Sequence, residues 1–350
     1  MNVSRLVGQW YDSNKRFLPW REDKNPYYIW LSEIILQQTR VAQGTPCYHR
    51  FIQSYPEIHD LAAASIEDVL LIWQGLGYYT RARNLHKAAN IIVHQFDGVF
   101  PADYEQIRKL PGIGDYTAAA IASLAFNQPY AALDGNVYRV LARYLGIYEA
   151  VNSNEGKKLF RQAALEMLDK KNPGKHNQAM IELGALICLP GNPLCRKCPI
   201  QDSCYAKKSN AIKELPVKRP KGRISHRFFY YLLIRKSDTV FIAQRGEGDI
   251  WALLYEFPLI ESDRELDPDE LMKTKNWKNF FSAGKIRALN FSEEYTHILS
   301  HQRLHTRFVE IKYEGNLDIP NSKCIPIKEL PDYPFPALIH KFLEGGKAFG

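Results

Sequence analysis

The chain has 350 residues, of which 45% are hydrophobic and 24% are charged, a composition typical of a globular protein with two or three domains. Its apolar runs are too short to span a bilayer, which excludes a membrane protein. Residues 1–20 mix charged and apolar side chains and resemble neither a signal peptide nor a transit peptide. We therefore expect a cytoplasmic protein in a reducing compartment.

Most of the formal net charge of +8 lies in one segment. Residues 207–227 contain eight basic residues and one acidic residue, so the rest of the chain carries a net charge of about +1. A solvated linker would explain such a segment. An arm that contacts DNA phosphates would explain it equally well, because anionic DNA attracts basic side chains and releases counterions. Charge alone leaves both interpretations open.

Apolar residues recur at helical spacing through residues 1–208, in segments bounded by Gly and Pro. We expect helices at Tyr28–Gln43, Leu85–His94, Asp115–Ala125, Asn136–Gly146 and Asn177–Cys188. Residues 209–226 contain prolines and a glycine among basic residues and lack any periodicity, which predicts an extended linker between domains.

Residues 227–350 have a different character. Aromatic and β-branched runs at Phe228–Arg235 and Thr239–Gln244, and the alternating run Arg303–Lys312, predict strands. Asp269–Asn276 and Phe335–Leu343 are expected to be helices. These elements indicate a second, smaller α/β domain.

A glycine-containing string, Leu110–Ala118, precedes an Ala-rich helix. Gly112 and Gly114 permit a tight turn, and the exposed amides at the following helix start can hold one DNA phosphate without reading sequence. A bare PGxG more often marks a plain turn before a helix. The full string resembles the hairpin of the helix-hairpin-helix DNA glycosylase superfamily.

Four of the six cysteines, Cys188, Cys195, Cys198 and Cys204, have the spacing C-x6-C-x2-C-x5-C. In a reducing compartment such a cluster favours metal ligation over disulfides, and thiolates bind both zinc and iron–sulfur clusters. The spacing is similar to the loop of the endonuclease III and MutY branch of that superfamily. The resemblance implies a [4Fe–4S] cluster on these four residues.

Two carboxylates precede or lie within predicted helices. Glu33, Gln37 and Arg40 fall on one face of a single helix, a pattern that a solvated polar stripe would also produce. The string Ser32–Val41 is similar to the signature of MutY-type adenine glycosylases, which implies that Glu33 is the proton donor. Asp134 before an apolar helix is typical of an N-cap. The resemblance implies that it also stabilises a developing sugar cation.

Tyr116 separates two classes of relative. Bifunctional relatives carry a lysine there, whose amine attacks the sugar and forms a Schiff base, whereas tyrosine cannot do this and implies a monofunctional enzyme. The resemblance assigns further positions with less specific motifs. Asn136 helps to hold the catalytic aspartate region, Gln38 and Tyr78 wedge into the base stack, and Trp20, Arg21 and Gln37 line the adenine pocket.

The second domain resembles, more loosely, the Nudix-like domain with which MutY-type proteins recognise 8-oxoguanine. Trp251–Pro258 is similar to a family segment, and Leu299-Ser300-His301 matches an F-S-H loop with leucine in place of phenylalanine. The resemblance implies that Ser300 and His301 contact the lesion. His297, His301 and His305 have the spacing of a metal site on a helix, but the alternation after Ser300 favours a strand.

Together these patterns predict a mainly α helix-hairpin-helix glycosylase domain (1–208, with a cluster loop at 188–204), a basic linker (209–226) and a Nudix-like α/β domain (227–350). The resemblance implies a monomeric enzyme that removes adenine opposite 8-oxoguanine or guanine from double-stranded DNA, nucleoid-associated if bacterial. A mismatch-specific thymine glycosylase, a bifunctional pyrimidine-damage lyase and a non-catalytic iron–sulfur DNA-binding protein are the alternatives. Tyr116 argues against the second, and the pair Glu33 and Asp134 against the third.

Overall fold

The computed structural model describes residues 3–220, 224–281, 285–314, 317 and 319–345. The chain divides into two compact units. The helical unit comprises Met1–Ala63 and Asn84–Pro220, and the sheet unit comprises Ala64–Arg83 and Lys221–Gly350. Ala64–Arg83 thus groups with residues far away in sequence, and the limits of independently folding domains stay a prediction. Among the described residues, no helix is both long and apolar enough to cross a membrane.

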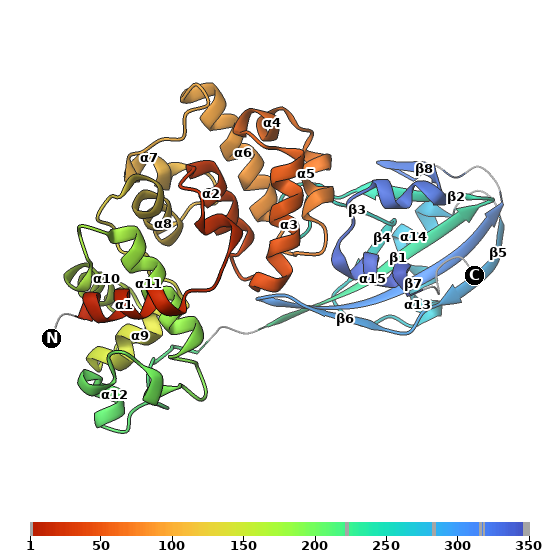
Figure 1. Ribbon diagram of the computed structural model, residues 1–350. Helices are drawn as coiled ribbons and strands as arrows, with labels where there is room; N and C mark the ends of the chain where they lie inside the picture. The colour runs from red at the N-terminus through yellow and green to blue at the C-terminus, as the bar shows by residue number, and fades with distance from the viewer. Residues whose placement is uncertain (1–2, 221–223, 282–284, 315–316, 318, 346–350) are drawn as a thin grey trace. The chain divides into compact units, whose positions relative to one another are not determined.

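The first part of the chain is almost entirely helical (Figure 1). Its elements are α1 (Val3–Asn14), η1 (Pro19–Arg21), α2 (Pro26–Ile35), α3 (Val41–Ser54), α4 (Ile58–Ala63), α5 (Ile66–Trp73), α6 (Thr80–Gln95), α7 (Tyr104–Lys109), α8 (Asp115–Phe126), α9 (Gly135–Leu145), α10 (Asn154–Met167), α11 (Pro173–Leu186), η2 (Cys195–Lys197), η3 (Gln201–Ser203) and α12 (Tyr205–Lys208). Helix α5 lies in the sheet unit and α6 spans the division between the units. The helices expected at Leu85–His94, Asp115–Ala125, Asn136–Gly146 and Asn177–Cys188 are present, with ends shifted by up to a turn or so.

The single helix expected over Tyr28–Gln43 is wrong. Helix α2 ends at Ile35, and α3 begins at Val41. Between them Gln38 has a φ of +56°, a left-handed conformation that breaks the helical hydrogen-bond ladder. Glu33, Gln37 and Arg40 therefore do not form one helical stripe, and the turn instead directs them separately.

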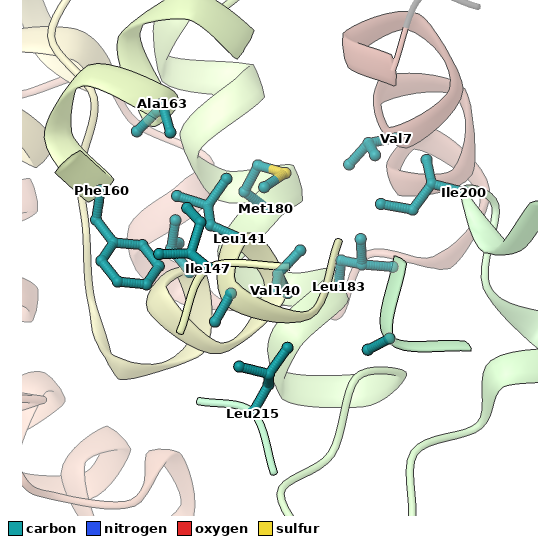
Figure 2. Packing of buried hydrophobic residues seen from close by; sticks show 14 of the residues in the cluster. Val7, Val140, Leu141, Ile147, Phe160, Ala163, Met180, Leu183, Ile200 and Leu215 are labelled. Atoms are coloured by element: carbon teal, nitrogen blue, oxygen red, sulfur yellow. The ribbon is translucent and has the colours of Figure 1, made fainter. Parts of the chain in front are cut away.

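A hydrophobic core joins helices α1, α9, α10 and α11 of the helical unit (Figure 2). Phe160, Leu141 and Leu183 are fully buried in it. Burial of a side chain of this size contributes about 1.5–3 kcal/mol relative to leaving it exposed. This core fixes the start of α9 against α11, and with it the position of Asp134.

The predicted linker begins later than expected. Ala211 and Leu215 are buried in the core of the helical unit, and the guanidinium of Arg143 donates a 3.0 Å hydrogen bond to the carbonyl of Leu215. The amide of Val151 donates to the carbonyl of Val217 over 3.1 Å. The interpretation of residues 211–217 as solvated chain is therefore wrong, although their lack of periodicity is real. Residues 221–223, which the linker prediction includes, lie outside the described residues.

A mixed sheet forms the centre of the sheet unit (Figure 1). Its main path has the order β3-β2-β1-β7-β5, with β4 beside β1, β6 beside β7 and β8 beside β2. Only the described pairing of β1 with β7 is parallel. The strands are β1 (Ser225–Lys236), β2 (Thr239–Gln244), β3 (Tyr255–Glu256), β4 (Leu259–Ser262), β5 (Lys285–Phe291), β6 (Tyr295–Ile298), β7 (Gln302–Glu314) and β8 (Ser322–Pro326). The three strands predicted from alternation and β-branched runs are all present.

Helices cover both faces of this sheet. Tyr230 of β1 and Val309 of β7 pack with Leu271 of α13 (Pro268–Lys273) and Trp277 of α14 (Lys275–Phe280). On the other face Phe308 stacks on a phenylalanine of α15 (Ala337–Glu344), with ring centroids 3.8 Å apart. The single helix expected over Asp269–Asn276 is two short ones, because Thr274 adopts an extended conformation and caps α14. A short η4 (Ile327–Asp332) precedes α15.

Candidate active site

A cavity of about 1040 Å³ opens in the helical unit. Its walls come from the η1 region, the end of α2 and the turn after it, the hairpin before α8, and the start of α9. Ten of the residues predicted for the site line this one cavity: Trp20, Arg21, Glu33, Gln37, Gln38, Gly112, Gly114, Tyr116, Asp134 and Asn136. The folded helical unit therefore brings together side chains that are about 100 residues apart in sequence.

Glu33 and Tyr116 form the centre of the cavity. The pKa of Glu33 is raised to about 7, mainly by burial and also by the charge of Asp134, although a hydrogen bond from the Tyr116 hydroxyl and the charge of Arg21 act in the opposite direction. Burial and the two neighbouring carboxylates also raise the pKa of Tyr116 well above its ordinary value. Tyr116 is thus a neutral hydrogen-bond donor, and Glu33 carries a proton in a substantial fraction of molecules near neutral pH. A carboxyl group in this state can act as a general acid.

Asp134 is the N-cap of α9, as its sequence context predicts. One carboxylate oxygen accepts a 2.8 Å hydrogen bond from the amide of Val137, and the other accepts a 2.7 Å bond from the side chain of Asn136. Burial raises the pKa of Asp134, while these hydrogen bonds and the charge of Arg139 act in the opposite direction. The bonds occupy one side of each oxygen and hold the carboxylate in a single orientation at the cavity wall.

Arg139 supports this arrangement from behind. Its guanidinium donates a 2.9 Å hydrogen bond to the side-chain oxygen of Asn136, which fixes the amide so that its nitrogen faces Asp134. It also donates to the carbonyls of Gly184 and Cys188, over 2.7 Å and 2.6 Å. Arg139 was not predicted from the sequence. A basic residue on the buried side of an otherwise apolar helix was the available signal.

The hairpin before α8 has the geometry that its glycines predict. Gly112 has a φ of +78°, and a Cβ there would lie only 2.8 Å from the Cβ of Asn84. Gly114 is the N-cap of α8 and offers no side-chain oxygen to the first amides of the helix. Those amides are available to a phosphate oxygen, and the helix dipole favours an anion there.

An unexpected carboxylate stands at this anion-binding end. Asp115, the first residue of α8, forms ion pairs with Arg161 and, over 3.6 Å, with Arg108. Arg108 also pairs with Glu105 over 3.0 Å, so two carboxylates balance the two arginines and the cluster carries no net charge. Neither arginine was predicted from the sequence, because they lie on α7 and α10 and only the fold brings them to Asp115.

A buried glutamate organises the wall formed by η1. Glu182 of α11 is inaccessible to solvent and accepts hydrogen bonds from the guanidiniums of Arg16 and Arg21, each at 2.8 Å. These two arginines lower the pKa of Glu182 to about 2, against the opposing effect of burial. Glu182 thus holds the side chains of Arg16 and Arg21 at the cavity wall. Glu182 was missed, although a charged residue on the buried face of α11 is a signal in itself.

The remaining predicted residues of the wall are placed as follows. The amide nitrogen of Gln37 lies 3.2 Å from the hydroxyl of Thr117. Trp20 is buried and its ring meets that of Tyr48 edge to face, with centroids 5.2 Å apart. Gln38 is exposed at the left-handed turn, as a residue that contacts DNA must be.

The four predicted cysteine ligands line one small cavity near η2 and η3, together with Arg143 and the apolar Ile187, Ala206 and Ile212. Arg143 donates to the sulfur of Cys188 over 3.5 Å and to the carbonyls of Leu189 and Pro190. In the described part of the chain, no group of three or more His, Cys, Asp or Glu side chains has the arrangement to hold a metal ion. Four thiols around one cavity nevertheless match the donor set of a [4Fe–4S] cluster.

The second predicted wedge residue, Tyr78, and the predicted lesion-contacting residues lie in the sheet unit instead. Ser300 and His301 form the exposed tip of the β6–β7 hairpin, where the amide of Leu299 donates to the carbonyl of Gln302 over 2.8 Å. Tyr78 is about half exposed, and its hydroxyl lies 3.4 Å from the hydroxyl of Ser300. His297 and His305 lie on strands, as the alternation predicts, so the helical metal site is excluded.

Proteins of known function with a similar sequence are adenine DNA glycosylases. The chain is 38% identical over 303 residues to the adenine DNA glycosylase of Buchnera aphidicola subsp. Baizongia pistaciae, covering 86% of this chain and 83% of the relative. It is 42% identical over 207 residues to the human adenine DNA glycosylase, covering 57% of this chain and 38% of that protein.

The chain belongs to the adenine DNA glycosylase family.

Family models match both parts of this adenine DNA glycosylase family member. Residues 31–168 match the HhH-GPD superfamily of base excision DNA repair proteins, and residues 229–345 match the NUDIX domain. Among solved structures, a thermostable thymine-DNA glycosylase is 27% identical, with a TM-score of 0.55, over 59% of this chain and 95% of that one. An endonuclease III–DNA complex, 23% identical with a TM-score of 0.52 over 60% of this chain and 95% of that one, shows the same helical fold. The predicted fold class, and the prediction that this is a DNA glycosylase, are confirmed.

Proposed function

We propose that the chain hydrolyses the N-glycosidic bond of adenine that is mispaired with 8-oxoguanine or guanine in double-stranded DNA. The observation that carries this proposal is the cavity in which Glu33, with a pKa near 7, and the fixed carboxylate of Asp134 both adjoin Tyr116. A target base inside a duplex is out of reach of such a cavity, so the adenine must flip out of the stack. The chain acts as a monomer in the cytoplasm, where its DNA substrate lies.

The two carboxyl groups take different roles because their surroundings differ. Glu33, protonated by virtue of its burial, donates a proton to the purine ring and improves the leaving group. Asp134, held by Asn136 and the amide of Val137, faces the positive charge that develops on the sugar. Water then completes the abasic site. Tyr116 orients Glu33 and supplies no amine, so no Schiff base forms and the DNA strand stays intact.

Three further sets of residues hold the duplex. The amides near Gly112 and Gly114 bind a phosphate at the N-terminus of α8. Gln38 and Tyr78 fill the space that the flipped base leaves. Ser300 and His301 at the hairpin tip contact the base opposite adenine, where their exposed hydroxyl and imidazole groups can hydrogen-bond to the atoms that distinguish 8-oxoguanine from guanine.

Cys188, Cys195, Cys198 and Cys204 hold a [4Fe–4S] cluster, whose thiolate bonds tie together the loop between α11 and α12. We expect Cys198→Ser to lose most of its bound iron and its visible absorption, and to bind duplex DNA at least tenfold more weakly. Cys324→Ser is the matched control, because Cys324 is an exposed cysteine of the sheet unit. Metal analysis that finds one zinc and no iron in the unchanged protein would contradict the cluster assignment.

The central experiment incubates the protein with duplexes that carry A opposite 8-oxoguanine, A opposite G, T opposite G, or thymine glycol. We expect strand breaks only after hot alkali, and only with the two adenine duplexes. The likeness to a thymine-DNA glycosylase structure makes T opposite G the informative competitor. Breaks without alkali would show a lyase, and preferential removal of thymine would replace the proposal with the mismatch-specific alternative.

A further inference from the structure

The loop between α5 and α6 holds a large aromatic side chain at the surface in a constrained backbone. Gly75, Gly77 and Tyr78 all have positive φ values, of +91°, +69° and +48°. Such a conformation is uncommon for a residue with a side chain and persists only where surrounding contacts hold it. The Tyr78 side chain nevertheless remains 48% exposed. The loop therefore displays this ring to solvent while its backbone is fixed from behind.

Arg81 supplies that support. Only 7% of this residue is exposed. Its guanidinium donates hydrogen bonds to the carbonyls of Leu76 and Gly77, over 3.3 Å and 3.1 Å. The indole nitrogen of Trp73 donates to the same Gly77 carbonyl over 3.0 Å. Two side chains thus converge on the peptide that directly precedes Tyr78.

The same guanidinium also contacts aromatic rings. Its central carbon lies 4.9 Å from the ring centroid of Trp73 and 5.7 Å from that of Tyr78. Guanidinium groups stack on aromatic faces, and the attraction strengthens where water is excluded. Arg81 therefore contacts both the backbone of the loop and the ring of Tyr78.

We propose that Arg81 is a positioning residue that presets the Tyr78 ring for insertion into the DNA base stack. The inference rests on the proposed function, in which Tyr78 is the wedge. A wedge on a loop with two glycines would otherwise lose much conformational freedom each time it enters the stack, and that loss would oppose base flipping. A guanidinium suits the task because its Nη2 donates to both carbonyls while its flat face contacts the Trp73 and Tyr78 rings, and a lysine ammonium has no such face.

The test compares full-length protein with Arg81→Lys, Tyr78→Ala and the double variant. The probe is a duplex with 2-aminopurine beside the mispair and 2′-fluoro-2′-deoxyadenosine as a target that resists cleavage. The fluorescence rise of 2-aminopurine reports unstacking. A matched duplex with ordinary deoxyadenosine gives the single-turnover excision rate.

We expect Arg81→Lys to reduce the fluorescence rise by more than half and the excision rate about tenfold, with less than a threefold change in affinity for undamaged DNA. In the Tyr78→Ala background the same change should have less than a twofold further effect, because there is no ring left to position. Arg83→Lys is the control on the same helix; its guanidinium bonds to the Thr80 hydroxyl and the Ala252 carbonyl, so its effects should add to those of Tyr78→Ala.

Additive effects of Arg81→Lys and Tyr78→Ala would overturn the proposal, because they would show that Arg81 acts independently of the ring. If Tyr78→Ala alone changes neither signal, the wedge role in the proposed function fails and the inference fails with it. If Tyr78→Ala is defective and Arg81→Lys is not, only the inference fails. Should Arg81→Lys melt at a markedly lower temperature, Trp73→Phe replaces it. Trp73→Phe keeps an aromatic ring at position 73 and removes the indole N–H that donates to the Gly77 carbonyl. It should reduce the fluorescence rise and the excision rate less than Arg81→Lys does, and this reduction should likewise disappear in the Tyr78→Ala background.

Discussion

The predicted site residues in the cavity of the helical unit and those at the hairpin tip of the sheet unit differ in solvent exposure and in hydrogen bonding. In the cavity, Glu33, Tyr116 and Asp134 are half-buried, bonded to one another or to the backbone, and have raised pKa values. At the hairpin, Ser300 and His301 are exposed. The difference teaches that bond cleavage needs groups whose protonation and orientation are set before substrate arrives, whereas recognition of a base can leave its groups in water until DNA replaces that water. Substitutions should therefore have large effects in the first region and small, selective ones in the second.

The largest effect is expected where a shifted carboxyl group is removed. Glu33→Gln retains the size of the side chain but has no acidic proton, so single-turnover excision of adenine should fall at least a thousandfold while duplex binding changes less than threefold. Glu22→Gln is the control, because Glu22 is an exposed carboxylate just after η1. Excision by Glu33→Gln within tenfold of the unchanged protein would remove Glu33 from the mechanism.

The pH dependence of excision sharpens the same point. In the proposed mechanism the acid form of Glu33 is the active one, so the single-turnover rate should be level below pH 7 and fall about tenfold per pH unit above it. The hydrogen bond from Tyr116 lowers this pKa. Tyr116→Phe should therefore move the alkaline limb to higher pH. A limb that Tyr116→Phe leaves in place would assign the titration to another group.

The raised pKa of Glu33 should also lower the free energy of unfolding at neutral and alkaline pH. The pKa of Glu33 is raised from 4.5 to about 7 by folding, so between these values the folded state holds a proton that the unfolded state has released. Stability then falls as pH rises from 4.5 to 7, by about 3 kcal/mol in total for this group. Glu33→Gln should accordingly be more stable than the unchanged protein at pH 8 and nearly equal to it at pH 4.5. Equal denaturant midpoints at both pH values would show that the carboxylate is solvated in the folded state.

The sequence was most informative where chemistry depends on local spacing. These features are all local: Asp134 caps α9, Gly112 makes a turn with a positive φ, and the four cysteines line one cavity. The break at Gln38 was missed because apolar periodicity continues through it. Glu182 was missed for a different reason, since a glutamate on a helix resembles a solvated residue until its two arginine partners are known.

Long-range grouping was the least predictable property. Ala64–Arg83 has the helical pattern of its neighbours, yet it belongs to the sheet unit together with a segment more than a hundred residues later. Burial of Leu215 in the core of the helical unit is equally invisible in a stretch without periodicity. In both cases the determining contacts join residues far apart in sequence, and no window of the sequence contains both partners.

The smallest effect is expected at the hairpin, and it should appear in selectivity rather than in rate. 8-Oxoguanine differs from guanine by one carbonyl and one N–H, and a hydrogen bond to such a group contributes about 0.5–1.5 kcal/mol net, or roughly two- to tenfold in a rate ratio. Ser300→Ala should therefore reduce the preference for adenine opposite 8-oxoguanine about fivefold, while excision opposite guanine changes less than twofold. Ser209→Ala is the control, because the Ser209 hydroxyl bonds to the carbonyl of Tyr205 in the helical unit.

A point variant is a cleaner test than deletion of the C-terminal residues, because deletion would also remove the packing partners of Ala64–Arg83. If the ratio of the two single-turnover rates is unchanged in both Ser300→Ala and His301→Ala, the hairpin tip does not read the opposite base. The two regions would then differ in solvent exposure alone, and recognition of the opposite base would have to be assigned to other residues.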